Sequence, residues 1–401
     1  MPPALPRSVE RPMPTLSLTL TLTRAATGYT ATLAATLPAA DTELAAGVPL
    51  TLNAEVLRSL EHIPNIYGAA LTEMVFSPPL REAWARGCGA SAGRGDALRL
   101  CLALDPADDA LHALLWETLR DPLTNLPLAR GEAVRLVRYL PSASLADLAP
   151  PPRPALRAVV AVAAPAEVPP LDVPGLVAAA RAGLSAMPST VLDGRDGRLT
   201  ATLPNLAAAL RDGAPILILA CHGALIEGEP YLWLEQDAPG PYRPIAGTAF
   251  VAALAQLERK PLLVVLAACQ GAGTSYEVLR AVGPQLARVG VGAVLAMREQ
   301  IPQATVAALL PPLFAELRRD GALDRALAAA RAALGETHPW WLPVLWLRTR
   351  DGQLWREEVP PPPPTPSGTT GTANVSGTVH GAAVGVNQGT IQLFFGQEPP
   401  P

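Results

Sequence analysis

The first part of the chain alternates apolar and polar residues with the period of a β-strand. From Leu16 onward, leucines alternate with Ser and Thr as far as Leu37, which predicts a β-hairpin that turns near Gly28. Residues 97–104 and 134–140 show the same period and predict two more strands. Apolar residues at helical spacing predict helices over 69–76 and 109–118. The sequence therefore predicts a β-rich α/β half at the start of the chain.

After residue 150 the pattern becomes a regular alternation of strands and helices. Two continuous apolar runs, 215–221 and 262–268, have the pattern of strands that are buried on both faces. This alternation predicts a mostly parallel sheet flanked by helices. The remaining expected elements are strands at 158–164, 190–192, 231–235, 293–297 and 341–347, and helices at 174–187, 203–211, 247–258, 276–289, 305–319 and 323–334.

Unevenly spread prolines and glycines suggest the domain boundaries. Proline clusters occur near the start of the chain, at Pro150–Pro154 and at Pro360–Pro364. The last of these favours an extended, semi-rigid spacer. The expected organisation is a loose leader (1–13), an N-terminal α/β half (14–150), a core domain (151–350), a Pro/Gly/Thr linker (351–372) and a terminal motif (373–397).

Composition and charge exclude several classes of function. Of the 401 residues, 49% are hydrophobic and only 16% are charged, so the chain can bury a large core. The net charge is −4 and no segment combines dense Lys and Arg with aromatics, which argues against nucleic-acid binding. No apolar run approaches the ~18 residues of a membrane span, and the N-terminal pattern is not that of a signal peptide. The four cysteines lack C-x-x-C spacing, which favours a reducing cytoplasm over a disulfide framework or a zinc site.

Both buried strands run directly into reactive side chains. His222 and Gly223 follow the first strand, and Cys269, Gln270 and Gly271 follow the second. Functional sites in open α/β sheets form at the carboxyl ends of strands, so we expect His222 and Cys269 to lie close together. An imidazole beside a thiol supports the nucleophilic thiolate. The sequence therefore predicts a catalytic Cys–His pair.

The glycines beside this pair have a predicted role in binding substrate. Gly223 and Gly271 allow a substrate to approach the backbone closely. The N–H groups of Gly223 and Cys269 are candidates for an oxyanion hole. The chemistry needs no metal or cofactor, and the sequence contains neither a P-loop nor a G-x-G-x-x-G motif.

The pattern around Cys269 resembles that of caspases. Residues 267–271 (AACQG) match four of five positions of Q-A-C-[RQG]-G, with His222 roughly 50 residues upstream. More widely, residues 60–350 resemble the CHAT family of caspase-like peptidases. The resemblance rests also on the segment 111–117 (LHALLWE) followed by Asp121-Pro122, on 293–300 and on 341–345 (WLPVL).

This resemblance implies a caspase-like fold, cysteine endopeptidase activity on a protein substrate, and a role beside bacterial sensor and defence proteins. Relatives specific for Arg or Lys often carry an Asp two residues before the nucleophile, where this chain has Ala267. A preference for basic residues is therefore not assigned. Arg298 and Glu299, which follow the next strand, are candidates for lining the substrate pocket.

Other interpretations of these residues stay open. A cysteine after a buried strand is often a small core residue, which is the interpretation favoured for Cys221. His112 lies in an apolar helical pattern and is expected to be structural. Besides a peptidase, the sequence is compatible with a catalytically silent adaptor that signals through its tail, or with a thiol hydrolase acting on small esters.

The terminal motif has an unusual pattern. Glycines recur every four residues from Gly377 to Gly389, valines lie between them, and residues 373–397 contain no Asp, Glu, Lys, Arg or Pro. Uncharged segments rich in β-branched residues favour cross-β stacking. The segment resembles bacterial amyloid signalling motifs, which implies self-association through 373–397 and a sensor with a matching tail, such as an NLR-like ATPase. A disordered tail and a single strand docking on a sheet edge are the alternatives.

Overall fold

The computed structural model describes residues 15–36, 41–105, 108–131, 133–139, 152–153, 156–236, 242–268, 278–298, 301–348 and 352–355. The chain divides into two compact units, Met1–Glu358 and Val359–Pro401, and every described residue belongs to the first. The predicted leader (1–13) and terminal motif (373–397) lie outside the described residues, as does the predicted linker apart from 352–355.

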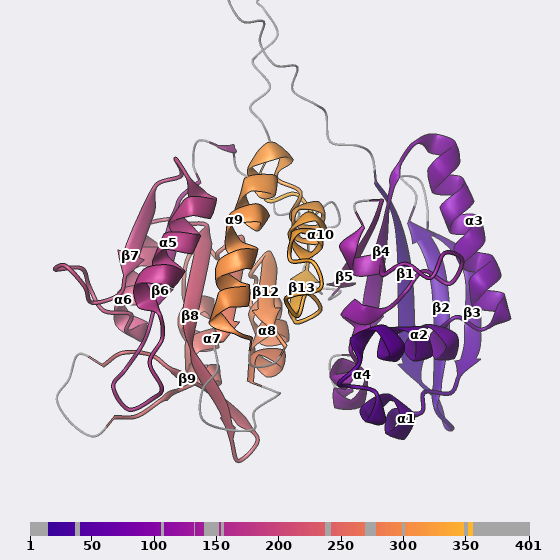
Figure 1. The fold of residues 1–401 in the computed structure, drawn as a ribbon, viewed down its shortest axis with the longest axis horizontal. Helices are drawn as coiled ribbons and strands as arrows, with labels where there is room; N and C mark the ends of the chain where they lie inside the picture. Colours follow the sequence, from indigo (N-terminus) through magenta and orange to yellow (C-terminus); the bar gives the residue numbers. More distant parts are fainter. Residues whose placement is uncertain are drawn as a thin grey trace, which may run out of the picture. The chain divides into compact units, whose positions relative to one another are not determined.

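The first unit is built around one mixed sheet of thirteen strands (Figure 1). Its main path runs β10-β9-β8-β11-β12-β13-β5-β4-β1-β2-β3, and β6 pairs with β8 and with β7 on another branch. Most pairs are parallel, including β6–β8, β8–β11 and β11–β12. The strands are β1 (Thr15–Arg24), β2 (Tyr29–Thr36), β3 (Asp41–Leu50), β4 (Ala97–Leu104), β5 (Val134–Tyr139), β6 (Ala158–Val162), β7 (Ser189–Leu192), β8 (Ile216–Ile226), β9 (Glu229–Trp233), β10 (Ile245–Ala246), β11 (Leu263–Ala268), β12 (Ala293–Met297) and β13 (Pro343–Leu347).

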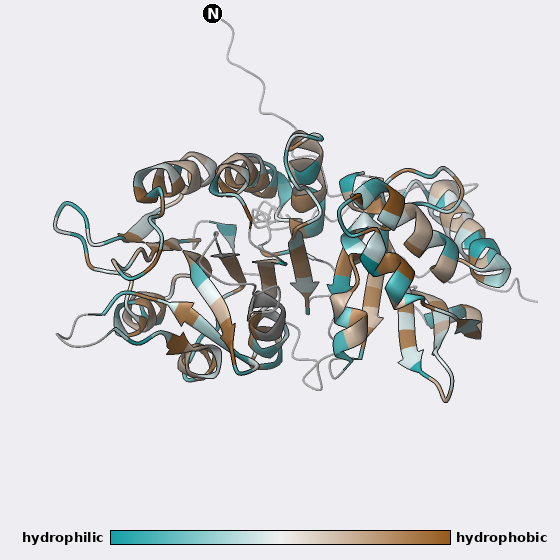
Figure 2. Ribbon diagram, turned by 60° about the horizontal axis from the view of Figure 1, so that its bottom comes forward, coloured by the Kyte–Doolittle hydropathy of each residue, from teal (hydrophilic) through white to brown (hydrophobic). Residues whose placement is uncertain are grey.

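Helices cover both faces of the second half of this sheet (Figure 2). Helix α9 contacts both α5 and α10, and helix α7 contacts both α6 and α8. The helices are α1 (Ala54–Ser59), α2 (Pro64–Val75), α3 (Pro78–Arg94), α4 (Asp109–Ala113), α5 (Val173–Leu184), α6 (Leu203–Arg211), α7 (Gly247–Ala255), α8 (Val278–Arg288), α9 (Gln303–Asp320) and α10 (Leu323–Ala333), with short 3₁₀ helices η1 (Trp116–Thr118) and η2 (Leu128–Arg130). The predicted α/β class is confirmed.

The position of the core follows from the hydrophobic pattern. Strands β6 and β12 are buried along their whole length, as expected of strands covered on both faces. In β1 every second residue from Leu16 to Leu22 is buried, so this strand packs one face against the core. In Figure 2 the strands of the second half are mostly brown. Within the described ranges, no helix combines the length and apolar character needed to cross a membrane.

The predicted hairpin is confirmed as β1 and β2. The two strands pair antiparallel, and Ala25 N–H donates to Gly28 O at 3.1 Å to close the turn. Gly28 has a φ of +78°, a conformation that glycine adopts without strain. A Cβ at this position would also lie 2.9 Å from Leu50 O on β3, so both backbone conformation and space favour glycine.

Strand β3 and helix α3 are among the elements of the first half that were not predicted. Strand β3 contains Gly47 and Pro49, which weaken a strand pattern, and its place at the sheet edge explains why proline is tolerated there. Helix α3 carries three glycines that suggest a loop. One of them, Gly87, faces Leu18 of β1 so closely that a Cβ would come within 2.5 Å of Leu18 Cδ1. Close packing against the sheet therefore explains Gly87.

The helix predicted over 109–118 is wrong in its extent. Helix α4 ends at Ala113, Leu114 is extended, and a separate 3₁₀ turn follows at Trp116–Thr118. The guanidinium group of Arg298 explains the break, because it donates to the carbonyl oxygens of His112, Ala113 and Leu114. A continuing helix would use those oxygens for its own hydrogen bonds.

Buried arginines join the two halves of the first unit. Arg99 of β4 donates to Asp324 Oδ2 from both Nε and NH2, at 2.7 Å each, and both side chains are at most 2% exposed. Arg331 of α10 donates to Ala129 O and to Pro343 O, which links η2 to the start of β13. Burial lowers the pKa of Arg331 to about 10. These contacts, with the β5–β13 pairing, hold both halves in one sheet.

Candidate active site

The candidate site is centred on the carboxyl ends of β8 and β11. The two strands run parallel from Ile216 opposite Leu263 to Cys221 opposite Ala268. His222 is the next residue of β8 after this paired segment. Cys269 follows Ala268 in the sequence but lies outside the described residues, as do Gly271 and Glu299.

The sheet topology explains why a site forms here. From β6 the chain passes through α5 to β7 on one side, and then through α6 to β8 on the other side. The connection direction therefore reverses between β6 and β8. In open α/β sheets, ligands bind in the crevice at such a point.

His222 is held firmly at this end of β8. Its side chain is 1% exposed, and Nε2 lies 2.7 Å from the carbonyl oxygen of Pro169, in the loop that follows β6. A carbonyl oxygen only accepts hydrogen bonds, so Nε2 carries the proton in this contact. In the neutral ring the lone pair then belongs to Nδ1, which is the nitrogen able to accept a proton. The contact with Pro169 therefore leaves Nδ1 as the unprotonated nitrogen of the neutral ring.

Gly223 continues β8 beyond the sheet's parallel core. From His222 to Ile226 the strand pairs antiparallel with β9, with Gly223 opposite Leu232. The strand predicted over 215–221 is therefore five residues longer at its carboxyl end. The continuous apolar run ends at Cys221 because residues 216–220 are the part of β8 that lies between β6 and β11. Ala224 and Leu225 lie beyond these two neighbours and are half-buried.

Cys221 belongs to the core, as the sequence analysis favoured. It is 2% exposed and packs in the main hydrophobic cluster. His112 is likewise buried, with Nε2 3.1 Å from Asp105 O, in line with the structural role expected of it.

Arg298 directly follows β12 and faces α4. As described above, it donates to three successive carbonyl oxygens at the end of that helix. These contacts tie the carboxyl end of β12 to the N-terminal half. The assignment of Arg298 to a substrate pocket stays a prediction.

The sequence analysis missed the residues that hold the loop 163–172. Glu235 Oε1 accepts from Ala164 N–H at 2.9 Å near the start of this loop, and Gln303 Oε1 accepts from Asp172 N–H at 2.6 Å at its end. Three prolines directly after the strand at 158–164 were the available signal, because they indicate a stiff loop at a carboxyl strand end.

The surroundings of the β8 end carry negative charge. Burial raises the pKa of Tyr242, and Cys221, Glu235 and Glu167 raise it further. The Tyr242 hydroxyl donates to Leu234 O at 2.8 Å, which keeps it protonated and close to β9. Glu167 lies in the same loop as Pro169, and Glu235 binds the start of that loop, so both carboxylates belong to segments next to the end of β8.

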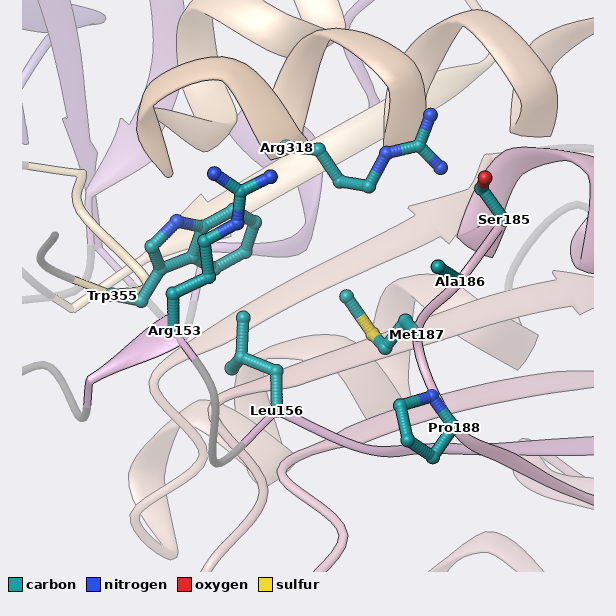
Figure 3. Close-up of a pocket in the computed structure, with 8 residues that line it drawn as sticks. All are labelled: Arg153, Leu156, Ser185, Ala186, Met187, Pro188, Arg318 and Trp355. Carbon is teal, nitrogen blue, oxygen red and sulfur yellow. The ribbon is translucent and has the colours of Figure 1, made fainter. Parts of the chain in front are cut away.

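A separate pocket lies at the opposite edge of the parallel strands. It has a volume of about 560 Å³ and includes Leu156 and Pro188, which precede β6 and β7. Figure 3 shows the side chains of Arg153 and Arg318 above Leu156 and Met187. Since His222 lies beyond the other end of these strands, this pocket is not part of the candidate site.

A structure of the Saccharomyces cerevisiae separase–securin complex matches with a TM-score of 0.38 and 12% sequence identity. The match covers 63% of this chain and 15% of that chain, so it spans a small part of the longer protein. No curated protein matches the sequence significantly. The family model of the CHAT domain matches residues 65–350, which is more than half of the sequence, and the protein therefore belongs to the CHAT domain family.

Proposed function

We propose that the protein is a cysteine endopeptidase of caspase-like type, with Cys269 as nucleophile and His222 as general base. One observation carries the proposal. Strands β8 and β11 are parallel with Cys221 opposite Ala268, and the sequence continues with His222 after one and Cys269 after the other. Consecutive Cα atoms are ~3.8 Å apart, so the register at Ala268 favours a short separation between these two residues.

The proposed reaction proceeds through an acyl-enzyme. Nδ1 of His222 accepts the proton of the Cys269 thiol, and the sulfur attacks the carbonyl carbon of the substrate peptide bond. The C–N bond then breaks, and the imidazolium returns the proton to the leaving amine. A water molecule, deprotonated by His222, hydrolyses the thioester and regenerates the thiol. The N–H groups of Gly223 and Cys269 are the proposed donors to the oxyanion.

The Pro169 carbonyl has a specific part in this scheme. It accepts from Nε2 at 2.7 Å in the described state. When Nδ1 takes the thiol proton, the ring becomes positive, and a hydrogen bond from a charged donor is stronger than one from a neutral donor. Pro169 would therefore favour the thiolate–imidazolium pair without a charged third residue.

The proposal extends to activation by clustering in a cytoplasmic bacterial defence or signalling system. Its support is the uncharged Gly/Val motif at 373–397 and family membership. A sensor with a matching tail would gather several copies, which raises the effective concentration of neighbouring peptidase units. The substrate is a protein.

The test is labelling of the purified full-length protein with a peptidyl electrophile, followed by peptide mapping. Wild type is expected to be labelled at Cys269, and labelling is expected to disappear in Cys269→Ala and to slow strongly in His222→Ala. Cys221→Ala is the matched control, because it removes a buried thiol that pairs opposite Ala268 and is expected to leave labelling intact.

Absence of labelling in wild type both with and without pre-formed tail fibres, with folding verified by circular dichroism, would reject the peptidase and favour the silent adaptor. For the clustering step, the tail at 359–401 is replaced by an inducible dimerisation domain. Cleavage activity is expected to depend on the dimeriser, and equal activity with and without it would reject activation by clustering.

A further inference from the structure

Three prolines limit how far the loop that carries the Pro169 carbonyl can hold itself through its own backbone. Pro165, Pro169 and Pro170 have no N–H group, so three of its residues donate no hydrogen bond. Within the loop, Val168 N–H donates to Pro165 O at 3.3 Å. The carbonyl that contacts His222 therefore depends on anchors at the two ends of the loop.

The end near β6 is anchored by two contacts. Ala163 N–H donates to Ala220 O of β8 at 2.9 Å, which extends the pairing of β6 and β8 by one residue. Ala164 N–H donates to Glu235 Oε1. This end is thus fixed by the sheet itself, whether or not the Glu235 side chain is present.

The end near α5 is anchored by the packing of Leu171 in the core and by the amide of one side chain. Gln303 Oε1 accepts from Asp172 N–H at 2.6 Å, and Gln303 Nε2 donates to Pro170 O at 3.5 Å. Pro170 directly follows Pro169, so the amide binds the chain one residue beyond the carbonyl that contacts His222. Asp172 in turn accepts from Gly175 N–H through Oδ1 at 3.0 Å and caps α5.

Gln303 is mounted on a rigid element. It is the first residue of α9, and Thr305, Val306 and Leu309 in the following turns are completely buried. Thr305 Oγ1 lies 3.0 Å from His338 Nδ1, which fixes this turn to the segment before β13. A side chain supported in this way can position its partner with little freedom.

We propose that Gln303 is a positioning residue for His222, because its amide holds the loop so that Pro169 O faces Nε2. Gln303 acts through the loop, because its amide binds Asp172 and Pro170 while the neighbouring Pro169 carbonyl contacts His222. The catalytic side of this inference rests on the proposed function of His222. The effect of Gln303 on which nitrogen of the His222 ring carries the proton can be measured without catalytic turnover.

The first readout is the ¹⁵N spectrum of the full-length protein labelled at its five histidines. The His222 signals are identified by their loss in His222→Ala. Wild type is expected to show the tautomer protonated at Nε2. Gln303→Met keeps the side-chain length but removes both hydrogen bonds, and it is expected to give averaged signals of the two tautomers. Gln303→Glu keeps an acceptor for Asp172 N–H and is expected to restore the wild-type tautomer.

Gln256→Met is the matched control, since Gln256 is exposed at the end of α7 and is expected to leave the His222 signals unchanged. In turnover, Gln303→Met is expected to lower kcat at least tenfold with an unchanged KM, because small misplacements of a catalytic group cost up to roughly 10²-fold in rate. Gln303→Glu is expected to recover most of kcat.

A His222 signal in Gln303→Met identical to that of wild type would overturn the inference. If wild type shows no peptidase activity, the proposed function fails while the tautomer measurement still decides the role of Gln303. If Gln303→Met does not fold, Gln303→Glu and Gln303→Asn replace it. The shorter amide of Gln303→Asn is then expected to lose the Nε2-protonated tautomer that Gln303→Glu retains, and equal spectra would reject the role.

Discussion

His222 Nε2 and Pro169 O lie 2.7 Å apart, so a backbone carbonyl oxygen accepts the Nε2 proton of this buried imidazole. The carbonyl fixes which nitrogen is protonated but adds no negative charge beside the ring. A catalytic role of His222 would then depend on orientation more than on charge.

The first prediction compares His222 with His112, because both rings are buried with Nε2 on a backbone carbonyl. We expect His222→Asn to lower kcat/KM by about 10²- to 10⁴-fold, the range of a lost general base. His112→Asn is expected to reduce thermal stability and to leave kcat/KM of the folded protein near the wild-type value. Peptidase assays at matched folded fractions check this, and equal losses in both variants would contradict it.

The second prediction concerns the pH dependence of thiol alkylation. Burial raises the pKa of both Cys88 and Cys101 to about 11, which leaves about one thiolate in a thousand at pH 8. Iodoacetamide at pH 8 is therefore expected to modify Cys269 and to spare both of these thiols. Because a raised thiol pKa means that the thiolate forms only on the alkaline side, labelling of the half-buried Cys88 is expected to increase as the pH approaches 11. Rapid modification of Cys88 at pH 8 would contradict the assignment.

The third prediction tests the buried ion pair of Glu117 with Arg138. Arg138 Nε and NH2 donate to the two carboxylate oxygens at 2.9 and 2.7 Å, and both side chains are at most 2% exposed. Glu117→Gln leaves the guanidinium buried without a counter-charge, so we expect it to lower the free energy of unfolding by roughly 3 kcal/mol. Urea unfolding followed by circular dichroism measures this change.

The exposed pair of Glu82 with Arg86 on α3 provides its control. Glu82→Gln makes the same chemical change on the surface, and the free energy of unfolding is expected to change by about 0.5 kcal/mol or less. Similar decreases in the free energy of unfolding of the two variants would mean that the buried ion pair stabilises the protein no more than the exposed one, which would contradict the prediction.

The fourth prediction compares two helical glycines. A Cβ added at Gly68 of α2 would lie 2.1 Å from the backbone oxygen of Thr118, so Gly68→Ala forces α2 away from η1. We expect it to lower the free energy of unfolding by about 1–3 kcal/mol. In Gly89 of α3 a Cβ would meet no atom within 4 Å, and Gly89→Ala is expected to stabilise the protein by up to about 1 kcal/mol. Thermal unfolding of both variants checks the opposite signs, and equal signs would refute the packing argument.

Some elements could be predicted from sequence because their pattern is local. The strand 97–104, the helix 203–211 and the strand 293–297 have the predicted bounds, since apolar composition and flanking turn residues define them. The same reasoning identified the two strands that precede His222 and Cys269. Their parallel register, with Cys221 opposite Ala268, is consistent with the expected meeting of the two strand ends.

Other features depend on contacts between distant segments and leave no local pattern. The end of α4 is set by Arg298, which is 184 residues from Leu114. Gly87 is explained only once Leu18 is known to lie beside it. The roles of Gln303 and Glu235 at the loop 163–172 likewise depend on segments 131 and 71 residues away. Single-sequence patterns contain no information about such partners.

The buried contact of Arg99 with Asp324 limits how this protein can be divided for engineering. A fusion that borrows only residues 156–355 would keep Asp324 in the interior but remove the cation that pairs with it. It would also leave one edge of β13 without β5. The smallest transplantable module is therefore the whole segment from β1 to Trp355, and designs that replace the tail should cut the chain after residue 358.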